Sequence, residues 1–239
     1  MTTADTAQLL PQLRASPLFA GIADDVLLDL LPHLHRHTWG KRQQIMPATQ
    51  TAKRFYLLTA GRVRIEAEHP ESGRAITLCL LGPGDGHNLV TLLDGKAETV
   101  MAETLDETTA LYAPLDLWRQ WLDDYPDLRH AAMRYAAARL RGLHELAEDL
   151  ALHDTSARLA HLLLRHLDNE PNLDNLVHED LGRMIGSVRV VVNRLLNRFR
   201  HEGIIETEAG QLRVTDLERL LHKAERRISD LCHGNDRTP

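Results

Sequence analysis

Short β-prone runs separated by turn signals constrain the fold of this chain more than any other feature. They lie between residues 38 and 113, about ten residues apart, and glycine-containing turns stand between them. The runs are residues 55–58, 63–65, 75–81, 100–104 and 110–112. No helical pattern interrupts them, so we predict an antiparallel barrel or sandwich in this segment.

The pattern becomes helical at residue 114 and stays helical over most of the remaining chain. A long helix is predicted from residue 126 to residue 153, and its apolar or small residues recur at alternating spacings of three and four. A seam of this kind needs a neighbouring helix, so we predict that two copies of the chain pair through it. The alternative is that the helix packs on the β-rich segment. The seam consists of Met133, Ala136, Leu140, Leu143, Ala147 and Leu150.

Two further helices, a glycine turn and two short strands follow a polar linker at residues 168–175. The helices are predicted at 178–185 and 187–201, with Gly186 between them, and a two-strand wing at 203–214 precedes a final helix from Asp216. This order is typical of a winged helix-turn-helix. The second helix carries no acidic residue and four basic ones, Arg189, Arg194, Arg198 and Arg200.

The distribution of charge removes an objection to nucleic acid as a partner. The formal net charge is −6, whereas phosphate binding needs a positive surface. Residues 1–125 hold 11 of the Lys and Arg residues against 16 of the Asp and Glu residues, so most of the acidity lies there. The arginine helix at 187–201 therefore predicts a local basic surface, and a merely solvated helix face is the alternative.

Composition excludes several classes of protein. Apolar residues make up 43% and charged residues 26%, as in globular chains. Two cysteines, Cys79 and Cys232, are too few for a disulfide framework or a four-cysteine metal site in one chain. No apolar run approaches the ~18 residues of a membrane span, and the first residues do not form a signal peptide. We therefore expect a soluble, cytoplasmic protein with no membrane partner.

The order of these parts and four motifs resemble the Crp/Fnr family of bacterial transcription regulators. Residues 13–22 are similar to the entry segment of the family, residues 55–65 to its cyclic-nucleotide-fold strands, and residues 180–196 with 202–205 to its helix-turn-helix. The resemblance implies an α+β fold with an N-terminal antiparallel β-roll, a double-stranded β-helix of the cyclic-nucleotide-binding type. The expected domains are a sensor β-roll at 1–125, a dimerisation helix at 126–153 and a winged helix-turn-helix DNA-binding domain at 154–239.

The resemblance implies a homodimeric one-component regulator, not an enzyme, that binds a palindromic operator in double-stranded DNA and contacts RNA polymerase. Its second helix is then expected in the major groove. Where the family usually has a glutamate that reads bases, this chain has Val190, so the usual operator of the family is not expected. Val190 is suited to a thymine methyl group and Asn193 to adenine. The expected DNA-binding residues are Ser187, Arg189, Val190, Asn193, Arg194 and Arg198.

The core that holds the two helices together is predicted from helical spacing. Its members are Leu181, Ile185, Val188, Val192, Leu195 and Phe199.

The effector implied by the resemblance is not cyclic AMP, and its identity is left unknown. Residues 83–99 correspond to the phosphate-binding cassette of the family, but Glu98 stands where an arginine should neutralise the phosphate, and Lys96 is the nearest cation. On the long helix, Leu143 and His144 replace the hydroxyl pair that holds the base. The iron–sulfur cluster of other members needs four cysteines, and this chain has two, so we do not expect this cofactor. The candidate effector pocket is His87, Asn88, Leu143 and His144.

Haem is the alternative cofactor, because carbon-monoxide-sensing relatives ligate it with a histidine in this same loop. His87 is the candidate ligand and His144 its companion, and no other metal is expected. The competing interpretation is that His87 caps the loop or lies at the surface.

Two further metal hypotheses are weaker. A histidine-metal β-barrel enzyme needs a convergent ligand set, for which the β-rich segment offers only Glu66, Glu103, His69 and His87. A second group, His33, His35 and His37, would share one face on a strand, but a solvated helix exit is the favoured interpretation.

Overall fold

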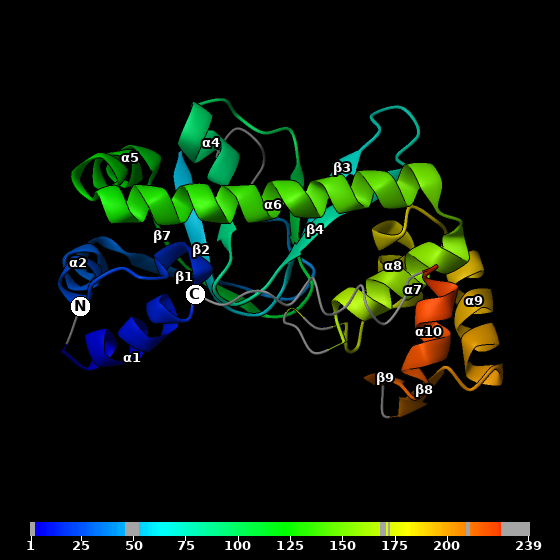
Figure 1. Cartoon of the computed structure of the whole chain (residues 1–239). Helices are drawn as coiled ribbons and strands as arrows, with labels where there is room; N and C mark the ends of the chain where they lie inside the picture. Colours follow the sequence, from blue (N-terminus) through cyan, green and yellow to red (C-terminus); the bar gives the residue numbers. More distant parts are fainter. Residues whose placement is uncertain (1–2, 46–52, 168–170, 172, 209–210, 226–239) are drawn as a thin grey trace. The chain divides into compact units, whose positions relative to one another are not determined.

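The computed structural model describes residues 3–45, 53–167, 171, 173–208 and 211–225. The chain divides into two compact units, of which one comprises residues 1–74 and 78–144 and the other residues 75–77 and 145–239 (Figure 1). Cys232 lies outside the described residues. Within the described residues, no helix is both long enough and apolar enough to cross a membrane.

The β-rich segment forms two sheets, as the spacing of the short apolar runs predicts. One sheet has the strand order β1-β7-β2-β5 and the other β4-β3-β6. The pairs β1–β7, β2–β7, β2–β5 and β3–β6 are antiparallel. The strands are β1 (His35–Trp39), β2 (Arg54–Ala60), β3 (Val63–Glu68), β4 (Ala75–Leu81), β5 (Gly86–His87), β6 (Met101–Thr104) and β7 (Thr108–Pro114).

The helix exit expected around His35 and His37 is wrong, because both residues lie on strand β1. This strand pairs along its length with β7, from His35 opposite Tyr112 to Trp39 opposite Thr108. The two imidazoles are exposed and lie against different rings, His35 against Tyr112 at 5.5 Å and His37 against Trp39 at 4.4 Å between centroids. His33 belongs to a preceding 3-10 turn (Leu31–His33).

A short helix, α4 (Leu89–Asp94), interrupts the β-rich segment, where no helix was expected. Asn88 precedes it in a left-handed conformation with φ of 78°. The two-residue strand β5 lies at the end of the glycine-rich turn, and this helix lies in the mostly apolar run that follows it. Cys79, in the apolar run at 75–81, is partly buried on β4.

The turn between β2 and β3 requires glycine. Gly61 has φ of 79°, and a Cβ atom there would collide with the carbonyl oxygen of Glu107 and lie 2.7 Å from the Cα atom of Thr108. Only a residue without a side chain allows the β2–β3 turn to pass so close to the start of β7.

Helices cover one side of the first sheet. Leucines of α1 (Thr3–Arg14) and α2 (Asp24–Leu30) pack with Phe55 and Leu57 of β2, with Trp118 and Trp121 of α5 (Leu115–Asp124), and with the first turns of α6 (Pro126–Leu152). Figure 1 shows α1 and α2, in blue, and α5, in green, at the N-terminal end of α6. This shared core fixes the start of the long helix to the β-roll.

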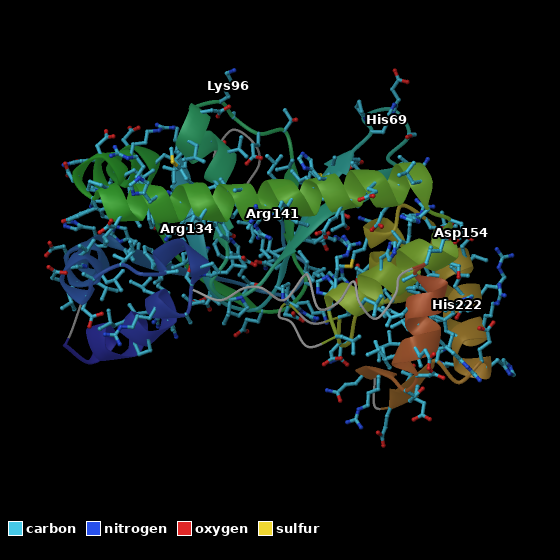
Figure 2. All side chains as sticks on the ribbon, viewed as in Figure 1. His69, Lys96, Arg134, Arg141, Asp154 and His222 are labelled. Atoms are coloured by element: carbon cyan, nitrogen blue, oxygen red, sulfur yellow. The ribbon has the colours of Figure 1, made fainter. Side chains whose placement is uncertain are left out.

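The second unit is a winged helix-turn-helix, as the sequence predicts. Its elements are α7 (Thr155–Arg165), α8 (His178–Met184), α9 (Arg189–His201), β8 (Ile205–Glu208), β9 (Gln211–Val214) and α10 (Leu217–Lys223). Asp154 and Asp216 cap α7 and α10, since their carboxylates accept hydrogen bonds from Ala157 N at 2.8 Å and Arg219 N at 2.9 Å. Figure 2 labels Asp154 at the start of α7.

Candidate nucleic-acid interface and sensor region

The turn between α8 and α9 brings the two helices into close contact. Gly186 adopts φ of 63°, and the Ser187 amide donates a hydrogen bond of 2.8 Å to the Gly182 carbonyl oxygen. A Cβ atom on Gly182 would lie 3.1 Å from the Ser187 carbonyl oxygen. The two glycines therefore set the angle at which α9 leaves α8.

One face of α9 is presented to solvent at its N-terminal end. Arg189, Val190, Asn193 and Arg194 are exposed, Val190 by 77%. In the part of the chain that the structure describes, no hydrogen bond or ion pair holds the side chains of Arg189 and Arg194. Both guanidinium groups are thus available to an external acceptor. Ser187, just before the helix, is partly buried.

The two later arginines of α9 are engaged within the unit. Arg198 Nε donates to Glu202 Oε1 at 2.8 Å, and Glu202 also pairs with Lys223 at 2.7 Å. Arg200 donates to Asn197 and to Thr207 on the wing. Arg198 therefore differs from Arg189 and Arg194, because it must leave a carboxylate before it can contact a phosphate.

The predicted helix-turn-helix core has one error. Leu181, Ile185, Val192, Leu195 and Phe199 are buried, but Val188 is 63% exposed. Val188 is the N-cap residue of α9, with extended backbone angles. Helical spacing does not apply to a residue before the first helical turn, so the periodicity misplaced it. Leu196, which is fully buried, belongs to the core in addition.

Most of the heptad stripe of α6 is not packed on the core of the first unit. An adjacent face of the helix packs there, through Leu128, Ala132 and Tyr135, and Ala136 of the stripe is partly buried against the same core. The large residues of the stripe remain exposed, Met133 by 58%, Leu140 by 53%, Leu143 by 43% and Leu150 by 38%, and Ala147 is exposed beside them. A repeated apolar stripe on a helix that is exposed to solvent is unusual for an isolated chain.

The four candidate effector residues do not form one buried pocket. His87 and Asn88 are buried, whereas Leu143 and His144 are exposed on α6. The side-chain amide of Asn88 donates to the Arg54 carbonyl oxygen at 2.8 Å, so it ties α4 to β2. The surface alternative for His87 is also wrong, since its side chain is only 4% exposed.

His87 does not fit a haem iron in this conformation. Burial lowers the pKa of His87 to about 4, so the imidazole is neutral, as a metal ligand must be. Its Nε2 atom has no hydrogen-bond partner but is enclosed by protein, and the ring stacks near Tyr56 at 6.3 Å between centroids. A porphyrin could reach this nitrogen only if the surrounding residues moved.

The residues that a β-barrel metal enzyme would need as ligands make other contacts in this structure. Glu66 and Glu103 pair with Arg64 at 3.0 and 2.8 Å. His69 lies in the exposed turn after β3 and accepts a hydrogen bond from the Ser72 amide (Figure 2). Glu66, Glu103 and His69 therefore do not converge on one metal position.

A cluster that was not predicted from the sequence joins the glycine-rich turn at 82–86 to α6. The Tyr135 hydroxyl donates to Asp85 Oδ1 at 2.9 Å and accepts from the Gly86 amide at 2.9 Å and from Arg139 Nε at 3.1 Å. Arg139 also pairs with Asp85 at 3.2 Å. The four-residue spacing of Tyr135 and Arg139 places them on one face of the helix, but nothing in the sequence pairs them with Asp85.

The phosphate-cassette region carries unpaired negative charge. Burial, together with the charge of Asp94, raises the pKa of Glu98, and among the described residues no ion pair holds this carboxylate. Lys96 is exposed on the loop after α4 (Figure 2). This local charge opposes an anionic ligand.

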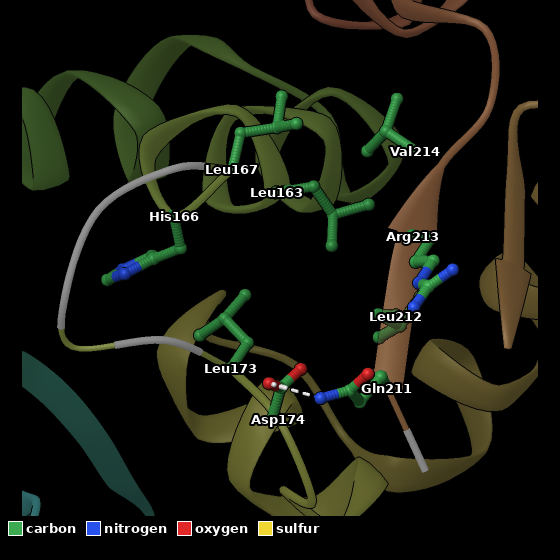
Figure 3. A pocket seen from close by; sticks show the side chains of 9 residues that line it. All are labelled: Leu163, His166, Leu167, Leu173, Asp174, Gln211, Leu212, Arg213 and Val214. Atoms are coloured by element: carbon green, nitrogen blue, oxygen red, sulfur yellow. Dashed lines mark hydrogen bonds between the residues drawn. The ribbon is translucent and has the colours of Figure 1, made fainter. Parts of the chain in front are cut away.

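A cavity of about 360 Å³ lies in the second unit between α7 and β9 (Figure 3). Leu163 and Leu173 form its apolar wall, and Gln211 donates to Asp174 at 3.3 Å across its floor. None of the candidate effector residues lines it.

Two family models match separate parts of the chain. Residues 36–125 match the cyclic nucleotide-binding domain, and residues 157–223 match the Crp-like helix-turn-helix domain. The first match covers the two sheets and the second covers α7 to α10.

Relatives match over most of the chain. A CRP-like cAMP-activated global transcriptional regulator of Mycobacterium tuberculosis is 26% identical over 220 residues, which cover 89% of this chain and 98% of the relative. A global nitrogen regulator of Nostoc is 27% identical over 187 residues, which cover 74% of this chain and 83% of the relative. Both relatives are global regulators.

Solved structures share the fold. FixK2 from Bradyrhizobium japonicum aligns with a TM-score of 0.70 at 20% identity, over 79% of this chain and 96% of that chain. A CooA mutant from Carboxydothermus hydrogenoformans aligns with a TM-score of 0.69 at 21% identity, over 82% and 90% of the two chains.

Proposed function

This chain belongs to the Crp/Fnr family of DNA-binding transcription regulators, and on that premise we propose that it reads a palindromic operator as a homodimer through the exposed start of α9. The observation that carries the proposal is the free face of Arg189, Val190, Asn193 and Arg194. We assign the sensor role to residues 1–125, dimerisation to 126–153 and DNA binding to 154–239. Contact with RNA polymerase and action in the cytoplasm belong to the same proposal.

The chemistry of this face favours direct base readout with phosphate contacts at its edges. Arg189, near the helix start, can donate two hydrogen bonds to guanine O6 and N7. Val190 offers a methyl contact to thymine in place of a carboxylate, and Asn193, one turn later, matches adenine. Ser187 and Arg194 suit phosphate contacts, and Arg198 would join them after exchanging Glu202 for a phosphate.

The exposed stripe of α6 supports pairing with a second copy of the chain. The stripe has the three-and-four spacing of a two-stranded coiled coil, and alanines at 136 and 147 allow the partner helix to approach closely. Two copies related by a two-fold axis present two recognition helices, which must lie about 34 Å apart to enter successive major grooves.

The sensor region favours an effector other than cyclic AMP. A cyclic phosphate would meet Glu98, whose carboxylate repels it, and the α6 positions for the base hold Leu143 and His144. The Tyr135–Asp85–Arg139 cluster offers the route by which a bound effector moves α6, since it connects the loop before His87 with the dimer helix. A ligand that displaces this loop would alter the spacing of the two recognition helices.

A mobility-shift titration tests the reading face, with a DNA fragment selected by the protein from a random-sequence pool. Arg189→Ala should weaken binding roughly 5- to 150-fold, because a bidentate guanine contact contributes ~1–3 kcal/mol. Arg194→Ala should reduce the slope of log affinity against log salt by about 1 if it neutralises one phosphate.

The control for this titration is Arg36→Ala, which removes the same charge from an exposed position on β1. It should leave both the affinity and the salt slope unchanged. Wild-type affinity and salt slope in both α9 variants would show that another surface contacts DNA.

A further inference from the structure

A small cavity of about 180 Å³ lies where the last turn of α6, helix α7 and the end of α10 meet. Figure 1 shows these three elements side by side in the second unit, and hydrogen bonds connect them. Four carboxylates line the cavity together with two imidazoles, those of His153 and His161. The carboxylates belong to Glu145, Glu148, Asp149 and Glu225.

The polar atoms of this cluster lie close together. His161 Nδ1 lies 2.6 Å from Asp149 Oδ1, and His153 Nδ1 lies 3.2 Å from Glu225 Oε2. The two imidazole rings are perpendicular, with centroids 4.8 Å apart. One ligand-type atom from each of Asp149, His153 and His161 can be chosen so that all three lie within 4.8 Å of one another.

A structural ion pair explains only part of this arrangement. Arg165 lies 2.6 Å from Asp149 Oδ2, so a buried Arg165–Asp149–His161 network would be complete without further groups. His153, Glu225 and the cavity itself are in excess of what that network needs. Among the described residues around the cavity, Arg165 is the one guanidinium that reaches these acids, at 2.6 Å from Asp149 and 3.8 Å from Glu145. The cavity thus has a surplus of negative charge.

The hydrogen bond made by the second ring nitrogen of His161 is typical of a metal-binding histidine. Its Nε2 atom lies 2.7 Å from the Ala224 carbonyl oxygen, to which it can donate. Metal-binding histidines almost always donate their second ring N–H to a carbonyl or carboxylate, which orients the ring and leaves the other nitrogen for the ion. His161 Nδ1, which faces Asp149 and the cavity, is that other nitrogen.

We propose that Asp149, His153 and His161 bind a divalent transition-metal ion of the zinc type, with Glu225 as the fourth ligand. Two imidazoles and two carboxylates are a donor set that suits Zn²⁺. On binding, the ion takes the lone pair of His161 Nδ1, and the proton now shared between this nitrogen and Asp149 leaves to solvent.

The required movements are small. Ligand atoms of a tetrahedral Zn²⁺ site with bonds of about 2.0–2.1 Å lie roughly 3.3 Å apart. Asp149 Oδ1 and His161 Nδ1 must therefore separate slightly from their present 2.6 Å, while His153 turns towards them. Asp149 can rotate because its other oxygen remains on Arg165.

Such an ion would cross-link three elements of the DNA-binding unit. Asp149 lies on α6, His161 on α7 and Glu225 just after α10, and His153 lies in the two-residue connection between α6 and α7. Metal binding would stiffen this connection. The consequence for operator affinity rests on the proposed function, whereas the site itself does not.

Isothermal titration of the metal-free full-length chain with Zn²⁺ tests the site, in two buffers of different ionisation enthalpy. We expect one ion per chain at the site and the release of a proton, seen as a buffer-dependent heat. Binding of Co²⁺ should produce the visible absorption bands of a tetrahedral site.

Variants separate this site from the many other histidines of the chain. His153→Ala removes a partly exposed ligand and should weaken Zn²⁺ binding at least tenfold without unfolding the unit. His161→Gln should do the same. The matched control is His222→Ala, an exposed histidine on α10 (Figure 2), which should keep wild-type affinity. Zn²⁺ affinity that is unchanged in His153→Ala, or no ion bound by the wild type, would overturn the proposal.

A DNA titration with and without Zn²⁺ distinguishes the two proposals. A shift in operator affinity that disappears in His153→Ala supports the regulatory consequence. If Zn²⁺ binds with no such shift, the regulatory consequence is wrong and the site stands. If the chain binds no DNA in any state, the proposed function fails independently of the metal.

Discussion

At the scale of single residues, the proposed base contact of Val190 limits which bases α9 would recognise. A carboxylate at this position would accept a hydrogen bond from cytosine N4 and could orient Arg189, whereas valine can do neither. Val190→Glu should therefore change the preferred base at one operator position. Affinity for the fragment selected by the wild type should fall roughly tenfold, because one mismatched contact costs ~1–3 kcal/mol.

Selection from a random pool, repeated with the variant, measures the change in base preference. Val90→Glu, at an exposed valine on α4, places the same charge in the sensor unit and should leave the preference intact. An unaltered preference in Val190→Glu would show that this side chain does not face a base.

His87 makes the stability of the chain depend on pH. Burial lowers its pKa from 6.5 to about 4, so between these pH values the unfolded chain binds a proton that the folded chain does not. The free energy of unfolding should consequently fall as the pH drops through this window, by roughly 3 kcal/mol in total. Above pH 6.5 this contribution is constant, because the imidazole is neutral in both states.

Urea unfolding at pH 7.5 and pH 4.5 checks this dependence, with His87→Phe as the comparison. The variant keeps an aromatic ring beside Tyr56 but cannot titrate, so it should lose less stability than the wild type on acidification. Equal losses in the two proteins would mean that His87 is protonated in the folded state.

At the scale of elements, two glycines predict opposite effects of the same substitution. Gly61→Ala should cost roughly 3 kcal/mol of the free energy of unfolding, because the left-handed turn and the contact with Glu107 and Thr108 both reject a Cβ atom. Gly142→Ala, in α6, meets nothing within 4 Å and should stabilise the chain by up to about 1 kcal/mol. Thermal unfolding of the two variants measures both effects, and a stable Gly61→Ala would contradict the geometry of the turn.

The elements that the sequence predicts are those with a long or repeated apolar pattern. Helix α6, the helix-turn-helix and the wing are confirmed close to their expected bounds. Strand β1 was missed because His35, Arg36 and His37 carry no apolar alternation, and its pairing with β7 is a long-range contact. Helix α4 was missed because a short, mostly apolar run, residues 89–93, fits a strand as well as a helix.

Among the site residues, too, those that follow a local sequence pattern were predictable, and those that long-range contacts bring together were not. The exposed face of α9 was predictable because helical periodicity separates it from the buried face. The Tyr135–Asp85–Arg139 cluster and the Asp149–His153–His161 cluster join residues far apart in the sequence or on different elements, and no spacing rule brings them together. His87 was expected in a loop, whereas the fold places it on strand β5 and buries it.

At the scale of the whole molecule, acidic and basic residues are distributed unevenly along the chain. Most of the net charge of −6 lies in residues 1–125, and the acid-free segment 187–201 lies in the unit proposed to bind DNA. An acidic sensor is repelled by phosphates, which favours an orientation in which α9 meets the DNA. A dimer would bring two copies of the basic helix α9 to the DNA, so we expect the affinity for DNA to depend on the oligomeric state.

Leu140→Glu tests that dependence. Leu140 is 53% exposed at the middle of the α6 stripe, so a charge there should leave the fold intact but repel its equivalent across the two-fold axis. We expect a monomer in sedimentation and light scattering, and operator affinity reduced roughly a hundredfold or more, because the second half-site no longer binds at high effective concentration. Leu28→Glu, at an exposed leucine of α2, should remain dimeric with wild-type affinity. A dimeric Leu140→Glu with unchanged affinity would show that the stripe does not form the interface, whereas a monomer with unchanged affinity would show that one α9 suffices for binding.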